Sequence, residues 1–200
     1  MRKAADLGSR EAQYTVAEIL SDIEDESETE EAFKYRMSIA KDLYSCASEQ
    51  GLGDASNELA LGLLFHKKYS EALVALHRGT KNGHDSSARR LSKAFGGKYK
   101  NDDMYFLNIP EDKERSRRYE IIAKYLSRYD YLHPKVPDLD EIVPLPPAKL
   151  PKWDGKIAFQ RWYEGEAPPK PSEALMQKLA NNGQYMSVSY THLTLPTTPY

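Results

Sequence analysis

Cysteine is nearly absent from this sequence, which contains only Cys46. One thiol cannot close a disulfide within the chain, and it gives no basis for a cysteine-based metal site. The sequence also has no run of apolar residues long enough to cross a bilayer, so membrane insertion is not expected. With a net charge of −2, it lacks the concentrated positive charge that would indicate nucleic acid as a partner.

Catalytic motifs are missing as well. There is no Gly-x-Ser-x-Gly elbow, and Gly96-Gly97 lacks the Lys-Ser or Lys-Thr that follows in a phosphate-binding loop. No two histidines stand four residues apart, the helical spacing that favours zinc. We therefore expect a protein that is not an enzyme, with no catalytic residues, no metal and no cofactor. A hydrolase that uses scattered carboxylates with His66 or His77 stays open as an alternative.

What the sequence does contain is a pattern of small residues around a glycine, repeated three times in the first half. Steps of four and seven residues keep these positions on one face of a helix, where small side chains let two helices approach closely. Each central glycine can end a helix in a left-handed turn. The pattern predicts a repeated unit of helix, glycine turn and helix, stacked because one unit cannot bury its apolar face alone. The repeat positions are Ala4, Gly8 and Ala12; Ala40, Ala47, Gly51, Ala55 and Leu59; and Ala72, Gly79, Gly83, Ser87 and Leu91.

The segments at residues 4–14 and 47–55 resemble Sel-one-like repeats, which are relatives of the tetratricopeptide repeats. The resemblance covers residues 1–97, with a first unit that looks truncated and a third in which Ser87 replaces the usual alanine. It implies an all-α fold, a right-handed α-solenoid of helix-turn-helix repeats used as a binding scaffold. The Gly-x-Gly-Val loop of a typical unit is missing, and an acidic run at residues 21–31 stands in its place.

The acidic run carries seven carboxylates. Calcium binding would need the glycine and the alternating spacing of a calcium loop, which this run lacks. We interpret it as a solvated loop whose last glutamates begin the next helix.

Residues 98–187 read as a different region. A helix is expected from about Glu111 to Tyr129, since Tyr119, Ile122 and Leu126 recur at helical spacing. It would cap the last repeat, and the five prolines of residues 137–155 predict an extended strap packed on the protein's own surface. Recognition of residues 144–147 by an aromatic groove of another protein is the alternative. The strap positions are Ile142, Val143, Pro144, Leu145, Pro146, Pro147 and Trp153.

The strap sequence of residues 137–155 and the Glu114–Tyr119 segment resemble an uncharacterised bacterial domain that follows Sel-one-like repeats, over about residues 86–165. The resemblance implies a bacterial protein, cytoplasmic or of the cell envelope, and no particular chemistry. Some bacterial proteins of this build neutralise secreted toxins, so an immunity protein is one hypothesis.

Both ends of the chain look artificial. Residues 188–200 resemble the translation of a sequencing-library adapter, and Met1 falls inside a repeat. We therefore expect a fragment, from which earlier repeats and any export signal could be missing.

The functional expectation is a monomeric module that binds another protein or peptide. In stacked helix pairs the first helix of each pair lines the concave side, where a partner can bind. By helical phase, the candidates for partner contact are Tyr14, Asn57, Glu58, Leu61 and Arg90.

Overall fold

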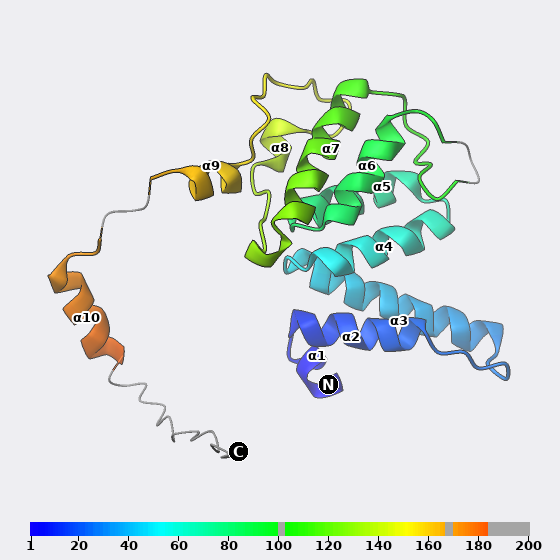
Figure 1. Ribbon diagram of the computed structural model, residues 1–200. Helices are drawn as coiled ribbons and strands as arrows, with labels where there is room; N and C mark the ends of the chain where they lie inside the picture. The colour runs from blue at the N-terminus through cyan, green and yellow to red at the C-terminus, as the bar shows by residue number, and fades with distance from the viewer. Residues whose placement is uncertain (100–102, 167–169, 184–200) are drawn as a thin grey trace, which may run out of the picture. The chain divides into compact units, whose positions relative to one another are not determined.

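A computed structural model describes residues 1–99, 103–166 and 170–183 of the chain (Figure 1). It is helical and contains no strand within these ranges, which confirms the predicted all-α class. Residues 188–200, expected to be foreign, lie outside the described residues. The helices are α1 (Arg2–Asp6), α2 (Arg10–Ser21), α3 (Glu30–Glu49), α4 (Gly53–Phe65), α5 (Tyr69–Lys81), α6 (Asp85–Phe95), α7 (Lys113–Arg128), the 3₁₀ turn η1 (Asp130–Leu132), α8 (Leu139–Ile142), α9 (Ala158–Glu164) and α10 (Glu173–Gly183).

The chain divides into two compact units, Met1–Glu164 and Gly165–Tyr200. The first holds α1 to α9, and the expected domain boundary at residue 97 falls inside it, between two helices that pack on each other. A single apolar core explains this, because it runs from the repeat helices into the C-terminal region. Its largest fully buried side chains include Leu76, Leu91, Phe95, Tyr119, Ile122, Leu126 and Leu139.

From α1 to α7, each helix packs on its neighbour in sequence, most extensively in the pairs α2–α3, α4–α5 and α6–α7 (Figure 1). Gly8, Gly51 and Gly83 lie between α1 and α2, α3 and α4, and α5 and α6, at φ of +91°, +91° and +97°. The predicted left-handed glycine turns between helices are therefore present. The more extensive helix packing, in the pairs α2–α3, α4–α5 and α6–α7, forms across the other loops.

Side-chain caps begin several of these helices. The side chains of Ser9, Thr29 and Asp112 accept a hydrogen bond from the backbone amide three residues on, and ring Nδ1 of His84 does the same for α6. Such caps satisfy amides that have no partner inside the helix. The start of α7 agrees with the helix expected from about Glu111.

The small-residue stripe is buried where two pairs meet. A Cβ on Gly79 would lie 2.5 Å from Ser87 Oγ, so the two helices of this turn approach too closely for alanine. Ser48 and Ser56 share a hydrogen bond of 2.7 Å between their hydroxyls at the preceding turn. On α1 and α2, Ala4 is exposed and Ala12 is only half-buried, although the sequence pattern predicts that both lie on a buried stripe. No described helix packs on that side of α1 and α2.

The proline-rich segment lies against α7, and Ile142 and Val143 are buried in the core. It is not extended throughout, because residues Leu139–Ile142 form the single helical turn α8. Pro137 precedes this turn and Pro144 follows it, so neither proline interrupts its hydrogen bonds. Leu145 and Pro146 are half-buried, whereas Pro147 is exposed.

Two buried arginines of α7 hold this segment. Arg118 donates to the carbonyl oxygens of Ile142 and Pro151, at 2.6 and 2.7 Å, and lies 5.6 Å from the ring centroid of Trp153. Arg115 donates to the carbonyl oxygen of Pro144 at 3.1 Å. Buried guanidinium groups need such partners, so the segment and α7 depend on each other.

The acidic run joins α2 to α3. Glu28 pairs with Arg36 at 2.6 Å, while most of the other carboxylates are exposed. No cluster of metal-ligating side chains occurs in the part of the chain that the structure describes.

Candidate interaction site

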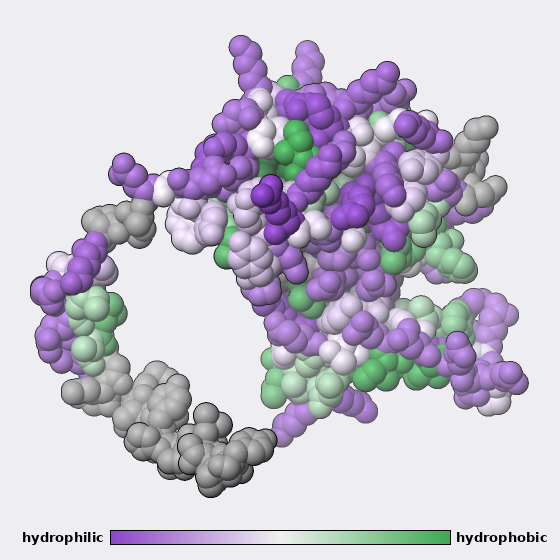
Figure 2. Space-filling model, viewed as in Figure 1, coloured by the Kyte–Doolittle hydropathy of each residue, from purple (hydrophilic) through white to green (hydrophobic). Residues whose placement is uncertain are grey.

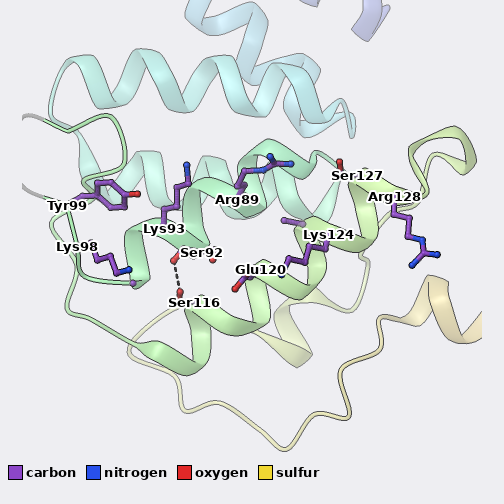
Figure 3. Close-up of a pocket in the computed structure, with 12 residues that line it drawn as sticks. Arg89, Ser92, Lys93, Lys98, Tyr99, Ser116, Glu120, Lys124, Ser127 and Arg128 are labelled. Atoms are coloured by element: carbon purple, nitrogen blue, oxygen red, sulfur yellow. Dashed lines mark hydrogen bonds and ion pairs between the residues drawn. The ribbon is translucent and has the colours of Figure 1, made fainter.

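A cleft of about 610 Å³ lies between α6 and α7 and is rich in cations (Figure 3). Arg89 and Lys93 stand on α6 at a step of four residues, and Lys124 and Arg128 stand on α7 at the same step. Lys98 and Tyr99 close one end. The cleft is open to solvent, and among the described residues Glu120 is the one carboxylate that lines it.

Two of the five cations are paired with acids of their own helix. Arg89 binds Asp85 at 2.8 Å, and Lys124 binds Glu120 at 2.7 Å. Such exposed pairs are weak, worth less than about 1 kcal/mol, and can exchange for another carboxylate. The positive charge of the cleft is therefore available to an acidic ligand.

Lys93 and Arg128 contact aromatic rings. Lys93 Nζ lies 3.9 Å from the centroid of Tyr105, and the Arg128 guanidinium lies 5.5 Å from that of Tyr129. The hydrogen bond with Lys93 lowers the pKa of the Tyr105 hydroxyl. Cation–ring contacts orient a side chain without neutralising its charge.

Next to the cleft, the end of α7 meets α9 in an aromatic cluster. Tyr129 lies 4.7 Å from Tyr125 and 6.4 Å from Tyr163, measured between ring centroids. Tyr131 and Trp162 project into solvent and are 69% and 70% exposed. Pale, weakly polar rings are visible where α9 approaches the end of α7 (Figure 2). We call the group Tyr129, Tyr131, Phe159, Trp162 and Tyr163 the aromatic patch.

Arg128 joins the two features, because it lines the cleft and lies over Tyr129 of the aromatic patch. The α7 surface thus combines positive charge with exposed rings. Arginine, tyrosine and tryptophan are the residues enriched at the energetic centres of protein interfaces.

A chain of hydrogen-bonded polar groups links α5, α7 and α8, and it is buried at His77 and Tyr119 and exposed at Asp140. His77 is 6% exposed, and its Nε2 lies 2.8 Å from Asp140 Oδ1. Because a carboxylate only accepts, Nε2 carries the proton and Nδ1 accepts from the Tyr119 hydroxyl at 2.7 Å. Lys81 pairs with the other oxygen of Asp140. Both ring nitrogens are thus occupied.

This chain of polar groups resembles a catalytic relay only in its residue types. Tyr119 is fully buried and stacks on Phe95 at 5.8 Å, so its hydroxyl does not reach solvent. Burial raises the pKa of Tyr119 and lowers that of His77. His66, the other histidine of the hydrolase alternative, is an exposed residue at the end of α4. The structure does not bring these two histidines together with carboxylates in a cleft.

The partner candidates from helical phase fall into different settings. Tyr14 is half-buried against Tyr44, and burial followed by the nearby carboxylates raises the pKa of its hydroxyl. Glu58 and Leu61 are also half-buried. Arg90 points to the loop after α6, where it lies 5.7 Å from the Tyr105 centroid.

Asn57 is the clear exception, since it is only 8% exposed. The phase argument gives α4 one buried face, but α4 packs on both α3 and α5. Two buried faces leave a narrow outer stripe that excludes residue 57. The structure therefore buries Asn57 instead of leaving it on the outer face that helical phase predicts.

The sequence does not reveal the cleft because its two walls stand on different helices, which residues 96–112 separate along the chain. Arg89, Arg90 and Lys93 form a visible cluster, but charges on one helix are typical of a solvated face. The signal that could have found the site is the second pair, Lys124 and Arg128, at the same spacing on the next helix.

No helix in the described ranges is both long enough and apolar enough to span a membrane. Among curated proteins and solved structures, none matches this chain. One family model matches residues 87–187, which include every residue that lines the α6–α7 cleft. The chain therefore belongs to the family described as Domain of unknown function (DUF6396).

Proposed function

We propose that this chain is a protein–protein interaction module whose partner binds the α7 surface, over the cleft and the aromatic patch. The observation that carries the proposal is the exposure of Tyr131 and Trp162 in the aromatic patch, where Arg128 lies over the Tyr129 ring. Exposed rings that gather in one patch mark interaction surfaces, and these residue types contribute most to binding energy at interfaces.

We also propose that the helix pairs stack as a right-handed solenoid of Sel-one-like repeats. Support comes from the order of packing, in which each helix contacts its neighbours in sequence, and from the recurring glycine turns. Quasi-linear stacks of this kind expose one side of every helix, which suits extended binding surfaces.

The test is affinity capture from native cells followed by calorimetry with the purified partner. A double variant, Trp162→Ala with Tyr163→Ala, should weaken binding by at least about tenfold, because it removes two central rings. Phe65→Ala is the matched control, since Phe65 is an 84% exposed ring on α4.

A third variant separates this surface from the one that helical phase predicts. Leu61→Arg places a charge on α4, at a half-buried position of the face that helical phase predicts for partner contact. Under the proposal it leaves partner affinity unchanged. Loss of binding in Leu61→Arg, with full affinity in the double variant, would move the interface to α4 and overturn our assignment.

A further inference from the structure

We infer that the α6–α7 cleft binds an acidic segment of the partner polypeptide, with Asp and Glu side chains seated between the two rows of cations. The inference rests on the proposed function and names the chemistry of the partner. Arg89 and Lys93 form one row and Lys124 and Arg128 the other, with Lys98 at the end.

The charge of the cleft is local. The chain as a whole has a net charge of −2, whereas the cleft is lined by five cations and one carboxylate. A field confined to one cleft attracts a short run of carboxylates, while the acidic remainder of the protein repels an extended polyanion.

Because Glu120 occupies Lys124, a ligand must bring a carboxylate of its own that can replace Glu120 in this ion pair. The Glu120 carboxylate holds Lys124 at 2.7 Å across one turn of α7. A carboxylate of the partner can pair with Lys124 or Lys93. Successive acidic residues of the partner can then pair with cations of α6 and α7 in turn. Lysine rows contribute mainly association rate and salt sensitivity.

The lining between the charges suits a polypeptide. Ala123 and the Tyr99 ring offer apolar surface, and the serines Ser92, Ser116 and Ser127 line the same cleft. The Ser116 hydroxyl already donates to the Ser92 carbonyl oxygen at 2.7 Å, so it can still accept from a peptide amide. A duplex phosphate backbone would not use these apolar and accepting groups.

The experiment measures fluorescence anisotropy with a labelled peptide of alternating Glu and Ser, at low and at physiological salt. The control peptide has Gln in place of every Glu. The chain should bind the acidic peptide and not the control, with an affinity that falls as salt rises. The double variant Lys93→Gln with Arg128→Gln should bind the acidic peptide about tenfold more weakly, since two contacting charges are lost.

A second double variant keeps the experiment specific. Lys149→Gln with Lys152→Gln removes the same charge from exposed positions of the strap, outside the cleft. It should bind like the unaltered chain. Equal losses in the two variants would show a general charge effect and overturn the inference.

Two further outcomes also decide against it. A labelled DNA duplex that binds as tightly as the peptide would assign the cleft to nucleic acid. Absence of peptide binding, while the partner still requires Trp162 and Tyr163, would remove the acidic ligand and leave the proposed function standing. Partner binding that ignores both Trp162 and Tyr163 would instead remove the proposed function.

Discussion

Nδ1 of His77 and the hydroxyl of Tyr119 lie 2.7 Å apart in the buried core, and their hydrogen bond joins α5 to α7. Asp140 fixes the other ring nitrogen at 2.8 Å from α8. One histidine therefore connects three elements that the sequence places in two regions. The contact joins the region after residue 97 to the same core as the helices before it.

Removal of the Tyr119 hydroxyl should destabilise the whole first unit. Tyr119→Phe leaves Nδ1 of His77 buried without a donor, which costs about 1–3 kcal/mol of unfolding free energy. Urea denaturation measures the change. Tyr131→Phe is the control, because Tyr131 is 69% exposed and its hydroxyl contacts water. Equal stability of the two variants would show that the buried hydrogen bond contributes nothing.

Stability should fall on mild acidification because of His77. Burial lowers the pKa of His77 below its usual value of 6.5, although Asp140 opposes the shift. The unfolded chain then binds more protons than the folded chain in the window from 6.5 down to the folded pKa. The contribution of His77 to the unfolding free energy is fully present above pH 6.5 and declines as the pH falls through that window.

The variant His77→Gln tests the source of this dependence. An amide side chain can replace both hydrogen bonds but does not titrate, so the decline between about pH 7 and pH 5 should become shallower. Urea midpoints measured across this range provide the comparison. An unchanged slope in His77→Gln would assign the dependence to other groups. Asp140 is distinct, since its pKa lies below 3.8, held down first by Lys81.

Local chemistry makes part of this structure predictable. Gly8, Gly51 and Gly83 are recognisable as turns because only glycine adopts a left-handed backbone without strain, and α7 follows from the spacing of Tyr119, Ile122 and Leu126. These are properties of short segments.

Features that depend on long-range pairing are not predictable in this way. Arg115 and Arg118 share the buried face of α7, but their partners are carbonyl oxygens of a distant segment, which carry no sequence signal. The sequence misplaces Asn57 because α4 has two packed neighbours. The α6–α7 cleft likewise exists only once two helices are side by side.

Alanine substitutions at three glycines compare the cost of backbone strain with the cost of a steric collision. Gly62 lies in α4 with open space where an added methyl group would lie, so Gly62→Ala should stabilise the protein by about 0.5–1 kcal/mol. Gly8 has open space but a φ of +91°, so Gly8→Ala should cost about 1–2 kcal/mol. At Gly83 a methyl group would also collide with the carbonyl oxygen of Pro134. Gly83→Ala should therefore be the least stable of the three in thermal denaturation, and any other order would contradict the turn geometry.

Substitutions of two adjacent arginines compare the stability that a surface ion pair contributes with the stability that buried hydrogen bonds to the proline-rich segment contribute. Arg117 and Arg118 both bind Glu114 at 2.8 Å, but only Arg118 reaches the carbonyl oxygens of Ile142 and Pro151. Arg117→Met should cost less than about 1 kcal/mol, because it removes only an exposed pair. Arg118→Met leaves the buried carbonyl oxygen of Ile142 and the partly buried one of Pro151 without this donor, and should cost about 2–4 kcal/mol.

The same pair of variants reports on the proline-rich segment. Without the Arg118 guanidinium, Pro151 loses its hydrogen bond to α7 while Arg115 still binds Pro144, so a protease should cut near residue 151 faster than in Arg117→Met. Urea denaturation and mass spectrometry of the cleavage products measure the two effects. Both variants keep a long side chain, which limits the loss of packing. If Arg118→Met is cut no faster than Arg117→Met, the segment is held by its apolar side chains, and the guanidinium contacts are secondary.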